Sequence, residues 1–248
     1  MADVYLEPVM WVAAGGALVA GLVRGFAGFG AGMIYIPVAA SAFDPRVAAG
    51  TLFIIDTIII IPLVIRATGH VAWREIAPLG LGAMIAVPAG VAVLIHVDPV
   101  PIRWGLSAAI LASIVVLASG WRYRGESSPP LAFGVGTVSG FMGGLANLYG
   151  PPIVLFWLGG QSLAPTVRAN IFAYSGMMIV VAGAALWFNG LFGARVFTFA
   201  FAMLPVYAIA LWAGTRAFRH ASESLFRWIA LVLCGIAALA GLPVWDGF

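Results

Sequence analysis

Eight long apolar segments follow one another along the chain, joined by loops of about ten residues or fewer. A helix of about 20 apolar residues spans the hydrocarbon core of a bilayer. Only 8% of the residues are charged, whereas soluble domains contain about 25%. The apolar runs are continuous rather than alternating, which argues against a β-barrel. The sequence therefore predicts an all-α polytopic membrane protein, with apolar segments at 9–41, 47–65, 75–97, 101–120, 131–160, 167–188, 195–214 and 224–242.

The remaining composition excludes several other classes. The first residues, MADVYLEPVMW, contain Asp3 and Glu7 but no basic residue, so we expect no cleaved signal peptide. A net charge of +3 gives no reason to expect a nucleic-acid partner. The single cysteine, Cys234, allows no internal disulfide, and the three histidines show no metal-ligand spacing. We expect neither a metal site nor a cofactor.

Two of the apolar segments are too long to be single membrane-spanning helices. As straight helices, 9–41 would be about 50 Å long and 131–160 about 45 Å, against a hydrocarbon core of about 30 Å. Glycines and prolines cluster at Gly25–Pro37 in the first segment and at Gly140–Pro152 in the second. We expect each segment to be a broken helix pair or a re-entrant hairpin, which gives eight to ten helical segments in all.

The two interrupted segments are copies of each other. Residues 21–38 align with 136–153 without gaps, and the similarity returns in DPRVAA and APTVRA. This internal duplication predicts two homologous halves, 1–120 and 131–248, joined by a polar linker at 121–130. Gly21, Val23, Gly25, Phe26, Gly28, Ala31 and Pro37 match Gly136, Val138, Gly140, Phe141, Gly143, Ala146 and Pro152.

Arginine placement predicts how the halves are oriented. If each interrupted segment returns to the side it entered from, eight arginines lie on one side and three on the other, namely Arg46, Arg103 and Arg195. If each crosses once, the split is six to five. Arg24 is left out of both counts as a buried residue. Because loops on the cytoplasmic side are enriched in arginine, the first arrangement is favoured. We therefore expect inverted repeats.

Interrupted helices at matching positions of two repeats are typical of transporter binding sites. A helix that restarts inside the membrane offers unpaired N–H groups and a positive dipole end, which favour an anion. Glycine also allows close approach to the backbone. These arguments make Gly25, Gly28, Gly30 and Gly150 candidate substrate-binding residues. The alternative is that the glycines only permit close helix packing.

The motifs in these segments resemble those of a known family. GLVRGFAGFGAGMIYIP in the first half, and GTVSGFMGGLANLYGPP followed by VRAN in the second, resemble the sulfite exporter family of the TauE/SafE type. The resemblance covers nearly the whole chain. It implies a multi-pass transporter of the bacterial inner membrane that moves sulfur-containing anions such as sulfite or organosulfonates. Two departures are that Arg24 replaces a small residue and that alanine separates Gly30 from Gly32.

Arg24 and Asp56 are the charged candidates. An arginine at the bilayer centre costs about 2.5–3.5 kcal/mol on insertion scales, so its position needs a reason. Arg24 is expected to pair with an anionic substrate, or else to reach an interface or a structural carboxylate. Asp56 lies in TLFIIDTIIIIP and is expected to be a proton carrier or a member of a permanent salt bridge with Arg24 or Arg168.

The second half supplies uncharged polar candidates. Asn147 lies inside the second interruption and can donate to the oxygens of an anion. Asn170 and Tyr174 are four residues apart and share a helix face, with Ser175 beside them. We expect these four side chains to contribute to the substrate site, and Tyr149, Gln161 and Arg168 are further polar candidates near the break.

Together these observations predict a secondary transporter of a small sulfur-containing anion, working by alternating access. A passive anion channel and a transporter of a different small organic anion are the alternatives. No motif of an intramembrane enzyme is present. The expected partners are the small anion and the lipid bilayer, and a homo-oligomer is left open.

Overall fold

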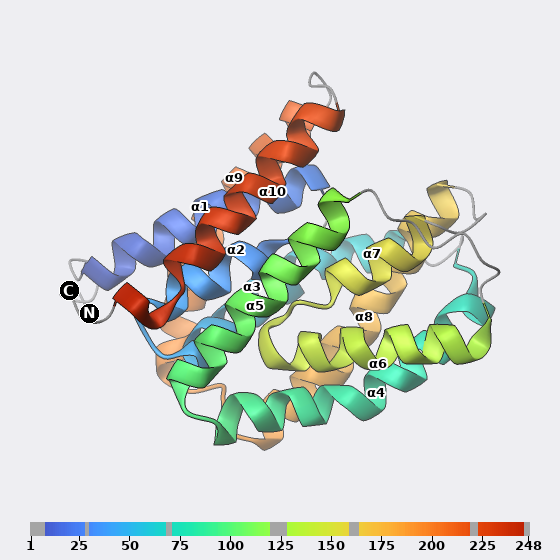
Figure 1. Cartoon of the computed structure of the whole chain (residues 1–248), viewed down its shortest axis with the longest axis horizontal. Helices are drawn as coiled ribbons and strands as arrows, with labels where there is room; N and C mark the ends of the chain where they lie inside the picture. The colour runs from blue at the N-terminus through green and yellow to red at the C-terminus, as the bar shows by residue number, and fades with distance from the viewer. Residues whose placement is uncertain are drawn as a thin grey trace. The chain divides into compact units, whose positions relative to one another are not determined.

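The computed structural model describes residues 8–27, 30–67, 71–119, 128–158, 164–218 and 223–245. Within these ranges the chain forms helices and no strand, so the all-helical prediction is confirmed (Figure 1). The helices are α1 (Pro8–Ala27), α2 (Ala31–Ala40), α3 (Pro45–Ala67), α4 (Trp73–His96), α5 (Pro99–Ala118), α6 (Pro129–Ala146), α7 (Gly150–Leu158), α8 (Ala164–Phe188), α9 (Ala194–Phe218), α10 (Glu223–Ala240) and a short 3₁₀ helix, η3 (Pro243–Trp245).

Six of the described helices are long and apolar enough to cross a membrane, which indicates a multi-pass membrane protein. This is fewer than the eight apolar segments expected. Helix α6 falls short because its glycines and prolines lower its hydropathy, and the described apolar part of α10 covers only Leu231–Ala240. The six are Pro8–Gly25, Pro45–Pro62, Trp73–His96, Pro99–Ala118, Ala169–Phe188 and Ala194–Arg216.

Both long segments are interrupted inside the predicted ranges. In the first, α1 ends at Ala27 and α2 begins at Ala31, and in the second, α6 ends at Ala146 and α7 begins at Gly150. The ungapped alignment pairs Asn147 with Gly32, so the second break lies about one turn later in the repeat than the first. The breaks are therefore related but not identical.

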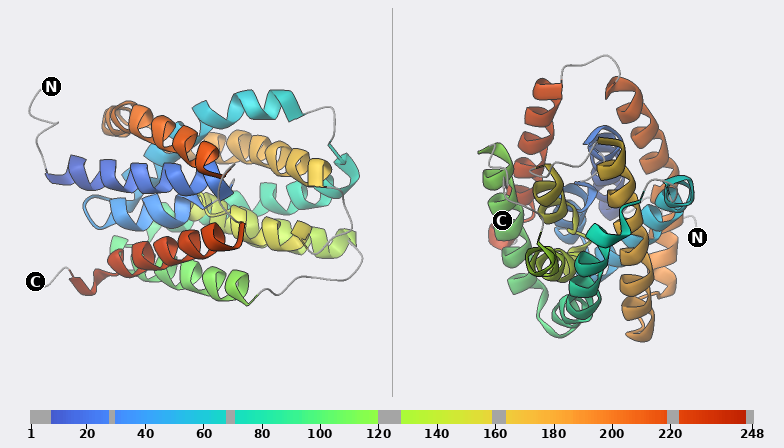
Figure 2. Two further views of the ribbon diagram at one scale, coloured as in Figure 1. Left: turned by 90° about the horizontal axis from the view of Figure 1, so that it is seen from above. Right: turned by 90° about the vertical axis from the view of Figure 1, so that its right-hand side faces the viewer.

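The chain forms two compact units, each described by itself. Unit 1 comprises Met1–Ile55, Val97–Ala118 and Phe192–Phe248. In it α1 packs along α2 and along α9 (Figure 2), and α10 packs against α2 and α5. A Cβ atom added to Gly21 would lie 2.6 Å from the carbonyl oxygen of Tyr207, and one added to Gly25 would collide with the carbonyl of Leu211. These glycines let α1 and α9 approach closely.

Unit 2 comprises Asp56–His96 and Ser119–Leu191. Here α6 packs along α4, and α8 packs against α4 and α6. Cβ atoms added to Gly136 and Gly140 would collide with the α4 backbone at Leu79 and Ala83. Gly136 and Gly140 are the repeat counterparts of Gly21 and Gly25, so the same glycine-mediated contact occurs in both units.

In each unit, a helix from one half of the sequence packs against a helix from the other half. Helix α1 of the first half packs on α9 of the second, whereas α6 of the second half packs on α4 of the first. Each compact unit therefore contains segments of both halves. The contacts at Gly21, Gly25, Gly136 and Gly140 support the alternative that these glycines permit close helix packing.

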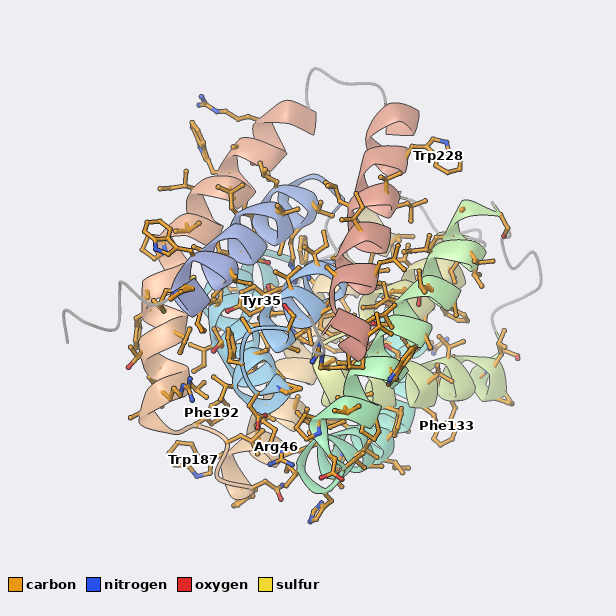
Figure 3. All side chains as sticks on the ribbon, turned by 60° about the vertical axis from the view of Figure 1, so that its left-hand side comes forward. Tyr35, Arg46, Phe133, Trp187, Phe192 and Trp228 are labelled. Carbon is orange, nitrogen blue, oxygen red and sulfur yellow. The ribbon has the colours of Figure 1, made fainter. Side chains whose placement is uncertain are left out.

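Large apolar side chains occupy the outer faces of the helices. Phe133, Trp187 and Trp228 project outward (Figure 3), and Trp187 is 67% exposed. Tyr35 on α2 is instead completely buried. This distribution suits a helix bundle whose outer solvent is hydrocarbon.

A buried arginine secures the end of α10 in unit 1. Arg103 on α5 donates from Nε to the carbonyl of Gly241 at 3.0 Å and from Nη2 to that of Leu242 at 3.3 Å. Ser107 donates to the carbonyl of Ala238 at 2.8 Å. Carbonyls at a helix C-terminus have no partner within the helix, so these donors satisfy them. Arg103 is a packed structural group rather than a solvated loop residue.

Candidate functional site

The second break in unit 2 joins two of the predicted site residues. Asn147 follows α6 with φ 56°, in the left-handed region that asparagine tolerates. Its backbone N–H and that of Leu148 donate to carbonyls of the last turns of α6. Its side-chain Nδ2 donates to Oδ2 of Asp56 on α3 at 3.2 Å. Asp56 is only 3% exposed, so this bond places an amide against a buried carboxyl group.

A second polar contact fixes the other side of the break. Tyr174 on α8 donates its hydroxyl hydrogen to Oγ of Ser139 at 3.0 Å, and Ser139 donates to the carbonyl of Tyr149 at 2.8 Å. The rings of Tyr149 and Tyr174 lie 6.3 Å apart. Ser139 and Tyr174 are completely buried. These bonds tie the break to α6 and α8.

Asn170 and Ser175 have structural partners. Asn170 accepts a hydrogen bond from the backbone N–H of Ala72 at 2.9 Å and donates to Oε2 of Glu75 at 3.0 Å, so its amide supports the start of α4. Ser175 donates to the carbonyl of Ile171, one turn back on its own helix, at 2.8 Å. Tyr174, one turn from Asn170, lies in the cluster at the break, whereas Asn170 lies at the start of α4.

The first break, in unit 1, differs from the second because a glycine, and no capping side chain, precedes its second helix. Gly30 precedes α2 with φ 94°, a conformation that favours glycine, and no side chain caps the helix. Nine of the ten residues of α2 are buried. The structure thus places the N-terminus of a helix, without a side-chain cap, inside the protein.

The other predicted residues of the first break lie on or beside α1. Arg24 is half-buried in the last turn of α1, where a positive charge complements the helix dipole. Gly25 faces the backbone of α9. Gly28 lies outside the described residues, and so does the side chain of Arg168. Gly150 is buried at the start of α7.

Two side chains near the second break, Ser139 and Trp157, were not among the residues singled out from the sequence. Ser139 was visible only as the repeat counterpart of Arg24. Trp157 on α7 contacts Tyr174 edge to face with ring centroids 6.5 Å apart. A tryptophan in an apolar segment gives no signal that distinguishes it from lipid-facing or core positions.

Among the residues with described positions, no group of three or more histidines, cysteines or carboxylates could hold a metal ion. The polar groups near the breaks are instead amides, hydroxyls, one carboxyl group and one guanidinium. Such groups can bind and orient a small ion through hydrogen bonds and charge.

The family comparison covers both breaks and both halves. Residues 13–241 match the family model described as sulfite exporter TauE/SafE. No curated protein and no solved structure matches the sequence. The resemblance seen in the glycine-rich motifs is confirmed, and the family is one of membrane transporters of sulfite and related sulfur anions. The chain therefore belongs to the sulfite exporter TauE/SafE family.

Proposed function

We propose that this protein is a secondary transporter that moves a small sulfur-containing anion, such as sulfite or an organosulfonate, across the bacterial inner membrane by alternating access. Membership of the family supports the transport of sulfur anions. The observation that favours an anion in this chain itself is the buried N-terminus of α2, which has no side-chain cap.

The first turn of α2 supplies the attraction for negative charge. A helix N-terminus carries about half a positive charge and N–H groups without partners in the helix. Gly30 has no side chain to shield them, and its left-handed backbone directly precedes the first turn of α2. Anions bind at such termini through backbone hydrogen bonds. The N-terminus of α2 can therefore hold an oxyanion without a lysine or a metal ion.

Arg24 is proposed to supply the compensating side-chain charge. It lies in the last turn of α1, on the approach to the first break. Charge-assisted hydrogen bonds from a guanidinium to an oxyanion are stronger than neutral ones. If Arg24 contacts the anion, Arg24→Ala is expected to raise the half-saturation concentration for uptake at least about tenfold. If Arg24 interacts only with the dipole of α1, that concentration will not change.

Asp56 is the proposed site of proton coupling. It is buried in α3 and accepts a hydrogen bond from Asn147, which lies at the second break. Protonation would turn one of its acceptor oxygens into a donor and remove a buried charge, so the contact with the break would change with the protonation state. The competing proposal is a permanent structural role for the same carboxyl group.

The repeats are proposed to be inverted in the membrane. The arginine distribution, eight to three in the sequence and eight to two without the buried Arg103, supports this orientation. Inverted halves provide two equivalent arrangements of the same parts, one open to each side, which is the usual basis of alternating access. A multi-pass protein with matched breaks suits this mechanism.

The substrate is identified by a binding screen. Purified protein is heated with sulfite, sulfate, thiosulfate and short alkanesulfonates, and a ligand that binds the folded state raises the melting temperature. Stabilisation by the sulfur oxyanions but not by chloride or small carboxylates supports the proposal. Stabilisation by carboxylates alone would favour a transporter of a different organic anion, the second candidate.

A further inference from the structure

The indole of Trp157 in unit 2 has an unusual environment. Trp157 is 3% exposed, and its Nε1 atom is buried with no hydrogen-bond partner within the described part of the chain. Buried polar groups in proteins are almost always hydrogen-bonded, because burying an unpaired donor costs stability. The position therefore needs an explanation.

The hydroxyl groups next to Trp157 have hydrogen-bond partners, unlike its indole N–H. Tyr174, whose ring contacts Trp157, donates its hydroxyl to Ser139, and Ser139 donates to the carbonyl of Tyr149. Elsewhere in the same unit, Thr137 donates to the carbonyl of Phe133 at 2.9 Å, whereas the hydroxyl of Thr57 is buried without a partner in the described part of the chain. In this cluster only the indole N–H is without an acceptor among the described residues.

Trp157 also lies next to the second break rather than on the lipid-facing surface. It belongs to α7, the short helix that begins directly after the break. The ring of Tyr174 is 6.5 Å from that of Trp157 and 6.3 Å from that of Tyr149, which is itself part of the break. An acceptor that reached the indole would therefore touch the same aromatic cluster that frames the break.

We propose that Trp157 binds the transported anion by donating a hydrogen bond from its indole N–H to an oxygen of that anion. The proposal rests on the proposed function and adds a contact at the second break. The indole N–H only donates and carries no charge, so it suits an oxyanion whose oxygens all accept.

The decisive variant is Trp157→Phe, with Trp187→Phe as its matched control. Phenylalanine keeps an aromatic ring against Tyr174 but removes the donor, whereas Trp187 lies on α8 of the same unit and is 67% exposed. In proteoliposomes supplied with sulfite or methanesulfonate, the half-saturation concentration is expected to rise at least about tenfold for Trp157→Phe. It is expected to remain at the wild-type value for Trp187→Phe.

A stability measurement separates binding from packing. Because the removed donor has no partner in the described protein, its loss leaves no acceptor unsatisfied, and any decrease in the ligand-free melting temperature of Trp157→Phe is expected to reflect only the volume lost with the larger ring. Trp157→His, which retains a ring N–H, is expected to recover part of the affinity, and it provides a second test if the phenylalanine variant does not fold.

The outcomes distinguish this inference from the proposed function. Wild-type half-saturation in Trp157→Phe would overturn the role of Trp157, while transport itself stands. The same conclusion follows if Trp157→His binds no better than Trp157→Phe. Failure of the wild-type protein to take up any sulfur oxyanion would overturn the proposed function itself.

Discussion

Asn147 donates a hydrogen bond to Asp56 over 3.2 Å, and this contact connects the break between α6 and α7 to the middle of α3. Asn147 has a left-handed backbone, and Asp56 is buried. The contact therefore combines a special backbone position with a buried carboxyl group, and it joins two of the residues that the sequence singled out separately.

Removing the side chain of Asn147 is expected to destabilise the protein. Asn147→Gly keeps the left-handed backbone accessible but leaves Asp56 without this donor, at a cost of about 1–3 kcal/mol. That corresponds to a decrease in melting temperature of several degrees, at about 2–4 °C per kcal/mol. Thermal unfolding in detergent measures it, with Asn189→Gly as control, since Asn189 is exposed and donates to the carbonyl of Ala185 one turn back on its own helix. Equal melting temperatures for the two variants would refute the role of the contact.

Asp56→Asn tests proton coupling. Asparagine has nearly the same shape but does not titrate, so uptake by this variant is expected to lose its dependence on an imposed proton gradient. Uptake is measured in proteoliposomes with and without that gradient, with the exposed Asp98→Asn as control. If Asp56→Asn responds to the gradient as wild type does, protons do not couple through this residue.

The packing glycines give a matched pair of substitutions on one helix. Gly140→Ala forces a methyl group against Ala83 of α4, whereas a Cβ at Gly134 meets no atom within 4 Å. Overpacking costs about 1–3 kcal/mol, and alanine gains up to about 1 kcal/mol over glycine in a helix. We expect Gly140→Ala to melt lower than wild type and Gly134→Ala to melt at the same temperature or higher. Identical behaviour of the two would show that close α4–α6 packing does not explain Gly140.

Much of the helix arrangement could be predicted because its signals are local. The length of the segments and the glycines and prolines within them predict both breaks, and Gly30 and Asn147 lie in the predicted ranges. The hydropathy that assigns membrane spans is likewise a property of consecutive residues. Among the described helices fewer count as spans than the eight segments expected, because glycines and prolines lower the hydropathy of α6 and the described apolar part of α10 covers only Leu231–Ala240.

The side-chain partners could not be predicted, because they come from distant segments. Asn170 contacts Glu75, which is 95 residues away, and Gly25 faces Leu211 on α9. Nothing near Asn170 in the sequence distinguishes a group that supports a helix start from one that binds substrate. The duplication predicts equivalent helices, but not that α4 and α9 pack on the first helices of the opposite halves.

A labelling experiment tests how the two sequence halves are oriented in the membrane. In a Cys234→Ala background, single cysteines are placed at Ser41 and Asn189, both of which are exposed. Inverted repeats place these two loops on the same side of the membrane, whereas parallel repeats place them on opposite sides. Impermeant maleimide added to oriented membranes is therefore expected to label both positions from the same side. Labelling from opposite sides would rule out inversion.

The most direct test of the central claim is accumulation of a sulfur oxyanion by purified protein in proteoliposomes. With a secondary transporter, sulfite or a short alkanesulfonate is expected to rise inside above its electrochemical equilibrium when an ion gradient is imposed, and to fall back when that gradient is dissipated. Uptake that only equilibrates, whatever gradient is imposed, would contradict secondary transport and identify a passive anion channel instead.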